Sequence, residues 1–344
     1  MSKLLNGIKV VELAGLAPVP HCGMILADFG AHVTVVDKSS SGAFEQRMTR
    51  GKHTVHMDLR KPEDIAKVKA MCKASDVLLD PYRPGALEKM GLDPVDLLKE
   101  NEGLIVCRIS GYGQTGPMKD EAGHDLNYVA MSGLLPVLAG RNSKRPWPPI
   151  NLLADFAGGS LTSAFGIVAA LTARERNGGK GCVIDCSMTE GVSYLASFIQ
   201  THYDIPHLFS ADYGAFTGEC PIYRTYSTKD EKFVAVAGLE PKFHQKMFTI
   251  LGIDGDDLFT EPEKIVKLLE NKFLTKTRDE WASVFEGQDA CVTPVLDINE
   301  VGDHKLHKDR NSYEYSEKYH GWVSNPAPRI STLEDLLKLK KSKL

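Results

Sequence analysis

Short valine-rich runs alternate with stretches of helical spacing through the first two hundred residues, and this alternation leaves few folds open. Strands are expected at residues 8–13, 31–37, 54–59, 76–80, 104–110 and 183–188. Helical spacing is found between several of them, at residues 21–29, 62–73, 94–100 and 161–174. Such alternation predicts a doubly wound α/β fold, in which helices cover both faces of a parallel sheet. We expect a large Rossmann-like domain over residues 1–205.

The pattern of expected strands and helices changes after about residue 205. Two expected strands, 233–238 and 291–296, flank three helical stretches at residues 241–251, 262–272 and 278–285. This order predicts a smaller α+β domain over residues 206–310. Residues 311–344 are expected to return to the large domain and to end in a polar tail.

Composition and missing motifs exclude several classes of function. A formal net charge of −4 argues against a nucleic-acid binder with a broad basic face. No run approaches the roughly 18 uninterrupted apolar residues of a membrane span. The turn after the first expected strand, residues 14–20, has one glycine and two prolines, so it lacks the glycine-rich fingerprint of a dinucleotide site. We expect no metal site either, because no zinc-binding spacing is present.

Two polar residues stand where a helix is expected to begin. His124 precedes an apolar run at residues 128–135, and Asp155 precedes apolar residues spaced as on a helix from Phe156 onward. An Asp in that position is a favoured N-cap, and an isolated His is commonly a hydrogen-bonded structural residue. The functional alternative is that the two side chains exchange a proton on opposite faces of one carbon. Backbone N–H groups near Asp155 and Phe156 would then stabilise the developing anion.

Four segments together resemble one protein family. They are Gly123-His124-Asp125-Leu126-Asn127-Tyr128, residues 152–159, the opening residues 7–13, and residues 26–31. In this order they are similar to the alpha-methylacyl-CoA racemases, a branch of the CoA-transferase family III superfamily. The similarity extends from about residue 6 to about residue 330 and includes residues 289–296.

The resemblance implies roles for individual residues. His124 and Asp155 match the catalytic pair of the family, and Glu240 matches the glutamate that partners the histidine. A CoA site is implied at Lys38, Met57, Asp58, Leu59, Arg60, Arg83, Gly123, His124, Asp125, Leu126, Asn127 and Tyr128. Basic residues there suit the CoA phosphates. The family also implies an interlocked homodimer, in which Glu240 reaches His124 of the other chain, and no cofactor besides the CoA of the substrate.

The implied activity is inversion of the 2-methyl stereocentre of branched acyl-CoA thioesters. One alternative is a CoA-transferase of the same superfamily, in which the aspartate that matches Asp155 is the nucleophile. His124 favours the racemase, because the transferases generally lack a histidine there. A second alternative is a CoA-thioester-binding protein without activity. It is motivated by the C-terminus, where only about sixteen residues follow Pro328 and family members usually continue for longer.

The last three residues, Ser342-Lys343-Leu344, match the signal that the peroxisomal import receptor reads. We therefore expect a peroxisomal protein that binds this receptor, and an additional mitochondrial pool stays open. The preferred acyl chain, whether a branched fatty acid or a sterol side chain, also stays open.

Overall fold

The computed structural model describes residues 4–38, 45–138 and 145–341 of the 344. The chain divides into two compact units. Unit 1 comprises the residues up to Leu135, Pro148–Ser197 and the residues from Pro326 onward. Unit 2 comprises Pro136–Trp147 and Phe198–Asn325. The tail signal Ser342-Lys343-Leu344 lies outside the described residues.

Unit 1 is built on a six-stranded parallel sheet, as the alternating pattern predicts. The strands lie in the order β3-β2-β1-β4-β5-β6. Their bounds are β1 (Lys9–Leu13), β2 (His32–Asp37), β3 (Lys52–His56), β4 (Val77–Asp80), β5 (Ile105–Ser110) and β6 (Cys182–Ser187). Central strands are buried on both faces, so they read as continuous apolar runs. The strand predicted at 54–59 ends earlier, because Lys61 N–H bonds back to the Asp58 carbonyl and closes a turn.

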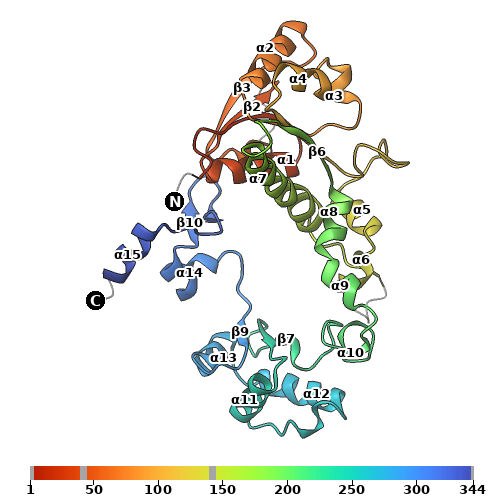
Figure 1. Cartoon of the computed structure of the whole chain (residues 1–344). Coiled ribbons are helices and arrows are strands. Elements are labelled where there is room, and N and C mark those ends of the chain that lie inside the picture. The colour runs from red at the N-terminus through yellow and green to blue at the C-terminus, as the bar shows by residue number, and fades with distance from the viewer. Residues whose placement is uncertain (1–3, 39–44, 139–144, 342–344) are drawn as a thin grey trace. The chain divides into compact units, whose positions relative to one another are not determined.

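Helices cover both faces of this sheet (Figure 1). The side chains of α2 (Pro62–Lys73), α3 (Ala86–Lys89) and α4 (Pro94–Glu100) share a buried cluster with Val11, Leu78 and Val106 of the strands. On the other face lie α1 (Pro18–Asp28) and α7 (Thr162–Arg174). The first helix was predicted to begin at residue 21 and begins at Pro18, because proline is favoured in the first helical turn.

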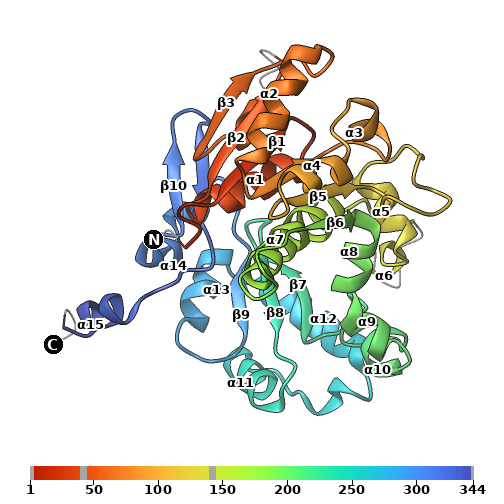
Figure 2. The ribbon, with the colours of Figure 1, turned by 45° about the horizontal axis from the view of Figure 1, so that its top comes forward.

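A ten-residue π-helical segment, η2 (Leu152–Leu161), precedes α7. It lies beside α5 (Asp125–Met131) and α8 (Met188–Leu195), and Figure 2 shows α5, α7 and α8 together from a second direction. Glycines allow the close crossing of η2 and α8. A Cβ on Gly191 would lie 2.0 Å from the carbonyl oxygen of Gly158. Unit 1 also contains η1 (Glu45–Met48) and α15 (Leu333–Lys341).

Unit 2 has its own core beneath an antiparallel sheet of β7 (Tyr223–Ser227), β8 (Phe233–Ala237) and β9 (Val292–Pro294). At its centre, Tyr226 stacks on Phe273, and Trp281 packs edge-on against Phe273. The helices are α9 (Ser197–His202, which begins at the unit boundary), α10 (Pro206–Phe209), α11 (Pro241–Leu251), α12 (Pro262–Phe273), α13 (Arg278–Phe285) and α14 (Lys305–Arg310). The remaining elements are α6 (Leu135–Leu138, also at the boundary), η3 (Asp256–Leu258), η4 (Val301–Asp303), β10 (Tyr313–Ser316) and β11 (Gly321–Ser324).

The joined helix Leu152–Arg174 is long and apolar enough to span a membrane by its length and composition alone. It packs against β5 and β6 of the sheet. A core helix passes the same test, so one such helix is weak evidence for a membrane.

Candidate active site at the carboxyl ends of the strands

Unit 1 has a cavity of about 700 Å³ at the carboxyl ends of its central strands. Residues that follow β1, β4, β5 and β6 contribute to its wall, among them Leu16, Pro81, Gly111 and Met188. In the order β3-β2-β1-β4-β5-β6, the chain reverses its winding direction between β1 and β4. Ligands of open α/β sheets bind at such a switch point. The fold therefore places the cavity where a substrate is expected.

His124 lines this cavity as the residue before α5. Its backbone is extended, and its N–H donates to the side-chain oxygen of Asn127 at 3.1 Å. Asn127 thus caps the first turn through the backbone of His124, and the imidazole stays exposed. The predicted helix start at this residue is confirmed.

Asp155 lines the same cavity, but the prediction that it is an N-cap is wrong. The N-cap of η2 is Asn151, and Asp155 lies one turn inside the helix. The Asn151 side chain donates to an Asp155 carboxylate oxygen at 3.2 Å. Sequence reasoning missed Asn151, although Asn is a favoured N-cap residue; here its side chain makes no capping hydrogen bond and contacts Asp155 instead.

Asp125 links the start of α5 to the first turn of η2. Its buried carboxylate accepts hydrogen bonds from the backbone N–H groups of Ala154 at 2.6 Å and Asp155 at 2.8 Å, both through Oδ2. The Asp155 N–H was predicted to stabilise a developing anion, but it already has this partner. Phe156 is the other donor in that prediction. Asp125 therefore acts on the backbone that carries Asp155, a contact that sequence reasoning did not predict.

Burial raises the pKa of Asp155 above the ordinary aspartate value, and the negative charge of Asp125 adds to the rise. The hydrogen bond from Asn151 and the charge of His124 oppose it. Burial also raises the pKa of Asp125, against the two backbone N–H groups that stabilise its anion. A carboxyl group in this position holds a proton more readily than an exposed one. Asp155 is therefore suited to donate a proton as well as to accept one.

Gly123, Leu126 and Tyr128 also line the cavity, whereas Asn127, another residue of the predicted CoA site, is not part of its described lining. The Tyr128 hydroxyl donates to the Gly123 carbonyl, and its ring packs edge-on against Tyr112. Burial raises the pKa of Tyr128 to about 12, so its hydroxyl stays protonated. Arg83, which follows β4, also lines the cavity, and its guanidinium donates to the Asp120 carbonyl at 3.3 Å.

The other residues of the predicted CoA site lie at the carboxyl ends of β2 and β3, outside the lining of the cavity. Lys38 is exposed and follows β2. Asp58 and Arg60 form a bidentate ion pair, with Arg60 Nη2 at 2.7 Å from an Asp58 oxygen. The hydrogen bonds from Arg60 are the main cause that lowers the pKa of Asp58, and Lys38 contributes. Met57 and Leu59 pack against the core of unit 1. The charged side chains here are those of Lys38, Asp58 and Arg60, and the apolar side chains between them pack against the core.

Glu240 belongs to unit 2, where it is the exposed residue before α11. Among the described residues, it is not part of the cavity that His124 and Asp155 line.

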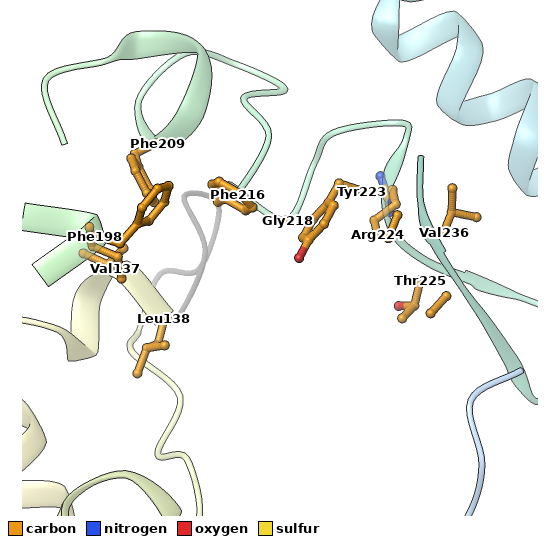
Figure 3. Close-up of a pocket in the computed structure, with 13 residues that line it drawn as sticks. Val137, Leu138, Phe198, Phe209, Phe216, Gly218, Tyr223, Arg224, Thr225 and Val236 are labelled. Carbon is orange, nitrogen blue, oxygen red and sulfur yellow. The ribbon is translucent and has the colours of Figure 1, made fainter. Parts of the chain in front are cut away.

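A second cavity of about 700 Å³ lies within unit 2 and is mostly apolar (Figure 3). Phe198, Phe209 and Phe216 form one side of it, and the β7 residues Tyr223 and Thr225 face them. Arg224 also contributes to the lining, but its guanidinium lies near Glu219 and Glu270. The described lining residues of this cavity include no carboxyl or imidazole side chain.

Within the described parts of the chain, no group of three His, Cys, Asp or Glu side chains is placed to hold a metal ion. The candidate site is therefore best described by its imidazole, its two carboxyl groups and its nearby arginine.

Comparisons with known proteins agree with this architecture. The sequence profile described as CoA-transferase family III matches residues 5–336. A Caenorhabditis elegans protein named CaiB/baiF CoA-transferase family protein ZK892.4 is 62% identical over 343 residues, which cover 100% of both chains. Human alpha-methylacyl-CoA racemase is 46% identical over 322 residues, 91% of this chain and 83% of the human one. The crystal structure of a CAIB/BAIF family protein from Brucella suis superposes with a TM-score of 0.79 at 24% identity and covers 100% of both chains, which supports the fold.

Proposed function

The chain belongs to CoA-transferase family III, and from this premise we propose that it inverts the 2-methyl stereocentre of branched acyl-CoA thioesters. The observation that carries the proposal is that His124 and Asp155 line one cavity at the carboxyl ends of the strands. The 46% identity to a human protein named a racemase supports the same reaction. We assign the catalytic roles to these two residues and to Glu240.

The proposed reaction is a 1,1-proton transfer. The bond between the α-carbon and its hydrogen breaks, the proton goes to one of the two side chains, and the electron pair forms an enolate with the thioester carbonyl. The other side chain then gives its proton to the opposite face of the planar carbon. A base and an acid on opposite faces are needed because this proton is weakly acidic. The raised pKa of Asp155 supports its part as the acid in one direction and the base in the other.

The enolate oxygen needs a hydrogen-bond donor. We propose that the start of η2 near Asp155 and Phe156 stabilises the enolate oxygen through the positive end of the helix, since the Asp155 N–H itself is bonded to Asp125. Asp125 supports the site in two ways: it holds the backbone at Asp155, and its charge raises the pKa of Asp155. This chemistry uses no cofactor beyond the CoA of the substrate.

We propose that Arg83 and the charges at the ends of β2 and β3 bind the phosphates of CoA. Arg83 lines the cavity, and a guanidinium recognises phosphate oxygens in a planar, bidentate manner. Lys38 is exposed and near the ion pair of Arg60 with Asp58. Arg60 is therefore the member of this group with a competing partner, and its contribution is expected to be smaller than that of Arg83.

We further propose an interlocked homodimer, in which Glu240 orients His124 of the other chain. Exposed apolar side chains on α7 and the residue before it support an interface. Phe165 is 74% exposed, Leu161 54% and Val168 42%. A stripe of this kind is unusual for a helix that meets only water. Localisation in peroxisomes, through the receptor that reads Ser342-Lys343-Leu344, is proposed on the sequence alone.

The alternative within the family is a CoA-transferase, in which Asp155 attacks a thioester and forms a mixed anhydride. Asp155 alone is compatible with both reactions. His124 in the same cavity favours proton transfer, because a transferase has no need of a second acid or base on the opposite face. The third possibility is a thioester-binding protein without activity.

A deuterium wash-in experiment tests the proposal. The full chain is incubated in deuterated water with an (R)-2-methylacyl-CoA and no acceptor acid. Incorporation of one deuterium at the α-carbon, together with formation of the S epimer, supports the racemase. In a second incubation that contains an acceptor acid, transfer of CoA to that acid without incorporation of deuterium supports the transferase. Binding of the thioester with neither reaction supports the inactive binding protein, and both of these results contradict the proposal.

A further inference from the structure

A buried ion pair lies beneath the start of α1. Lys52 Nζ of β3 lies 2.7 Å and 2.9 Å from the two carboxylate oxygens of Glu12 of β1, and the two side chains are 1% and 2% exposed. The same Lys52 donates to the Pro20 carbonyl at 2.6 Å. Gly23 makes room for the pair, because a Cβ there would lie 1.8 Å from Glu12 Oε2. Two strands and the first turn of α1 are thus joined by one buried cation.

His21 follows Pro20 and reaches from α1 to η2. Its Nδ1 lies 2.6 Å from the Ser160 hydroxyl, and Ser160 is fully buried. Its ring packs edge-on against Phe156, with ring centroids 4.9 Å apart. Burial and the charge of Lys52 lower the pKa of His21. A neutral imidazole therefore makes both contacts near neutral pH.

The two contacts enclose the turn of η2 that carries Asp155. A π-helix closes hydrogen bonds between residues five apart, so Ser160 lies one wide turn after Asp155, and Phe156 is its immediate neighbour. π-helices are rare and occur mostly as single turns, and this one extends over ten residues. Relaxation to an α-helix would rotate Asp155 relative to its neighbours. Contacts that hold the wide turn therefore fix the direction of the carboxyl group.

We propose that His21 is a positioning residue, which holds η2 in its π-helical turn through Ser160 and Phe156 and so keeps Asp155 directed into the cavity. This inference rests on the proposed proton transfer, because it concerns the residue that we assign as one of the two acid–base groups. His21 itself is not among the residues that line the cavity in the described chain.

The first test compares His21→Ala with His21→Asn in the wash-in assay. His21→Ala should lower kcat for α-proton exchange by about 10- to 100-fold, because small misplacements of a reacting group have effects of this size. KM should change less than about twofold, since the groups proposed to bind CoA are untouched. In His21→Asn, an amide takes the place of Nδ1 and should restore most of kcat. His32→Ala is the matched control, because His32 is exposed at the amino end of β2.

A double variant tests whether Ser160 is the contact through which His21 acts. Ser160→Ala should lower kcat, and His21→Ala/Ser160→Ala should lose no more than the larger single loss. Multiplicative losses in the double variant would contradict the proposed route. A His21→Ala variant with kcat within twofold of the parent protein, or with a changed KM and an unchanged kcat, would overturn the proposal.

Amide hydrogen exchange provides a readout that does not depend on activity. In His21→Ala, the amides of residues 152–161 should exchange faster, whereas those of the control His32→Ala should not. Unchanged exchange there contradicts the inference even if activity falls. If the parent protein shows no α-proton exchange at all, the proposed function fails, and the amide measurement still decides whether His21 holds η2.

Discussion

The Asp125 carboxylate accepts a 2.8 Å hydrogen bond from the backbone N–H of Asp155, across 30 positions of the sequence. The same oxygen accepts from Ala154. Removing the carboxylate would leave two backbone donors without a partner in a largely buried place. Asp125→Ala should therefore lower the free energy of unfolding by about 2–4 kcal/mol in urea titrations. Asp125→Asn keeps an oxygen acceptor, so it should lose clearly less.

Asp125→Asn removes the negative charge of Asp125 but keeps an oxygen acceptor, so it tests the effect of the charge alone. The negative charge of Asp125 helps to raise the pKa of Asp155, so its removal should shift the pH profile of α-proton exchange to lower pH. A profile that stays in place, or that shifts upward, would show that the charge of Asp125 does not act on Asp155.

His124→Ala should abolish α-proton exchange and leave the fold intact. The helix start depends on the Asn127 side chain and on the backbone of His124, and alanine keeps that backbone. Exchange is measured by wash-in and stability by urea unfolding. Asn127→Ala is the opposite control, because it should cost about 1 kcal/mol of stability while both acid–base groups remain. Near-normal exchange in His124→Ala would remove His124 from the mechanism.

The protonation of Asp155 should affect the two directions of the reaction in opposite ways. Where Asp155 takes the proton, it must begin ionised, so kcat should rise as the pH rises through its pKa. Where Asp155 gives the proton, it must begin protonated, so kcat should fall as the pH rises through the same pKa. Burial raises that pKa, so both changes should lie above the range of an ordinary aspartate. Initial rates from the R and S epimers check this, and Asp155→Asn should abolish both.

Removing Lys52 from its ion pair with Glu12 should make the free energy of unfolding more dependent on pH. Burial raises the pKa of Glu12 to about 7 even with Lys52 beside it. Lys52→Met removes the opposing charge, so this pKa should rise further. A group whose pKa is higher in the folded state stabilises the protein below its unfolded pKa and loses that contribution as the pH rises.

Glu12 of the parent protein already loses this contribution up to about pH 7, so the free energy of unfolding of Lys52→Met should fall more steeply than that of the parent only above about pH 7, by up to about 1.4 kcal/mol per pH unit. Urea titrations on both sides of that pH measure it. The control is Glu12→Leu/Lys52→Met, in which no buried charge is left, so the added pH dependence should vanish and much of the stability should return. A flat difference for Lys52→Met would contradict the buried position of Glu12.

Two glycines on neighbouring helices offer a matched pair for packing. A methyl group at Gly191 would meet the Gly158 carbonyl at 2.0 Å, so Gly191→Ala should force η2 and α8 apart at a cost of about 1–3 kcal/mol or more. At Gly166 of α7, the nearest atoms are side-chain carbons of Ile184 at 3.7 Å, an ordinary contact. Gly166→Ala should be neutral or stabilise by up to about 1 kcal/mol. Equal stability of the two variants in urea would contradict the close crossing.

Much of the large unit could be predicted from the sequence. The strands of a parallel sheet and the helices between them differ in the spacing of their apolar residues, and a short stretch of sequence is enough to recognise that spacing. The helix starts at Pro62 and Pro94 match the structure for this reason. The predicted strand at 54–59 and the predicted break at Pro18 were displaced, because a turn and a helix N-terminus use the same residue types as a loop.

The sequence by itself determined the order of the elements and the residue types that can transfer a proton, namely an imidazole at position 124 and a carboxyl group at position 155. Only the tertiary structure decided that the two share a cavity and that Asn151, not Asp155, occupies the N-cap position of the helix. It also decided that Asp125 holds the Asp155 backbone. The physical reason is the separation along the sequence over which each interaction acts. Periodicity and capping act over a few residues, whereas burial, close helix crossings and hydrogen bonds between distant segments arise only once the sheet brings those segments together.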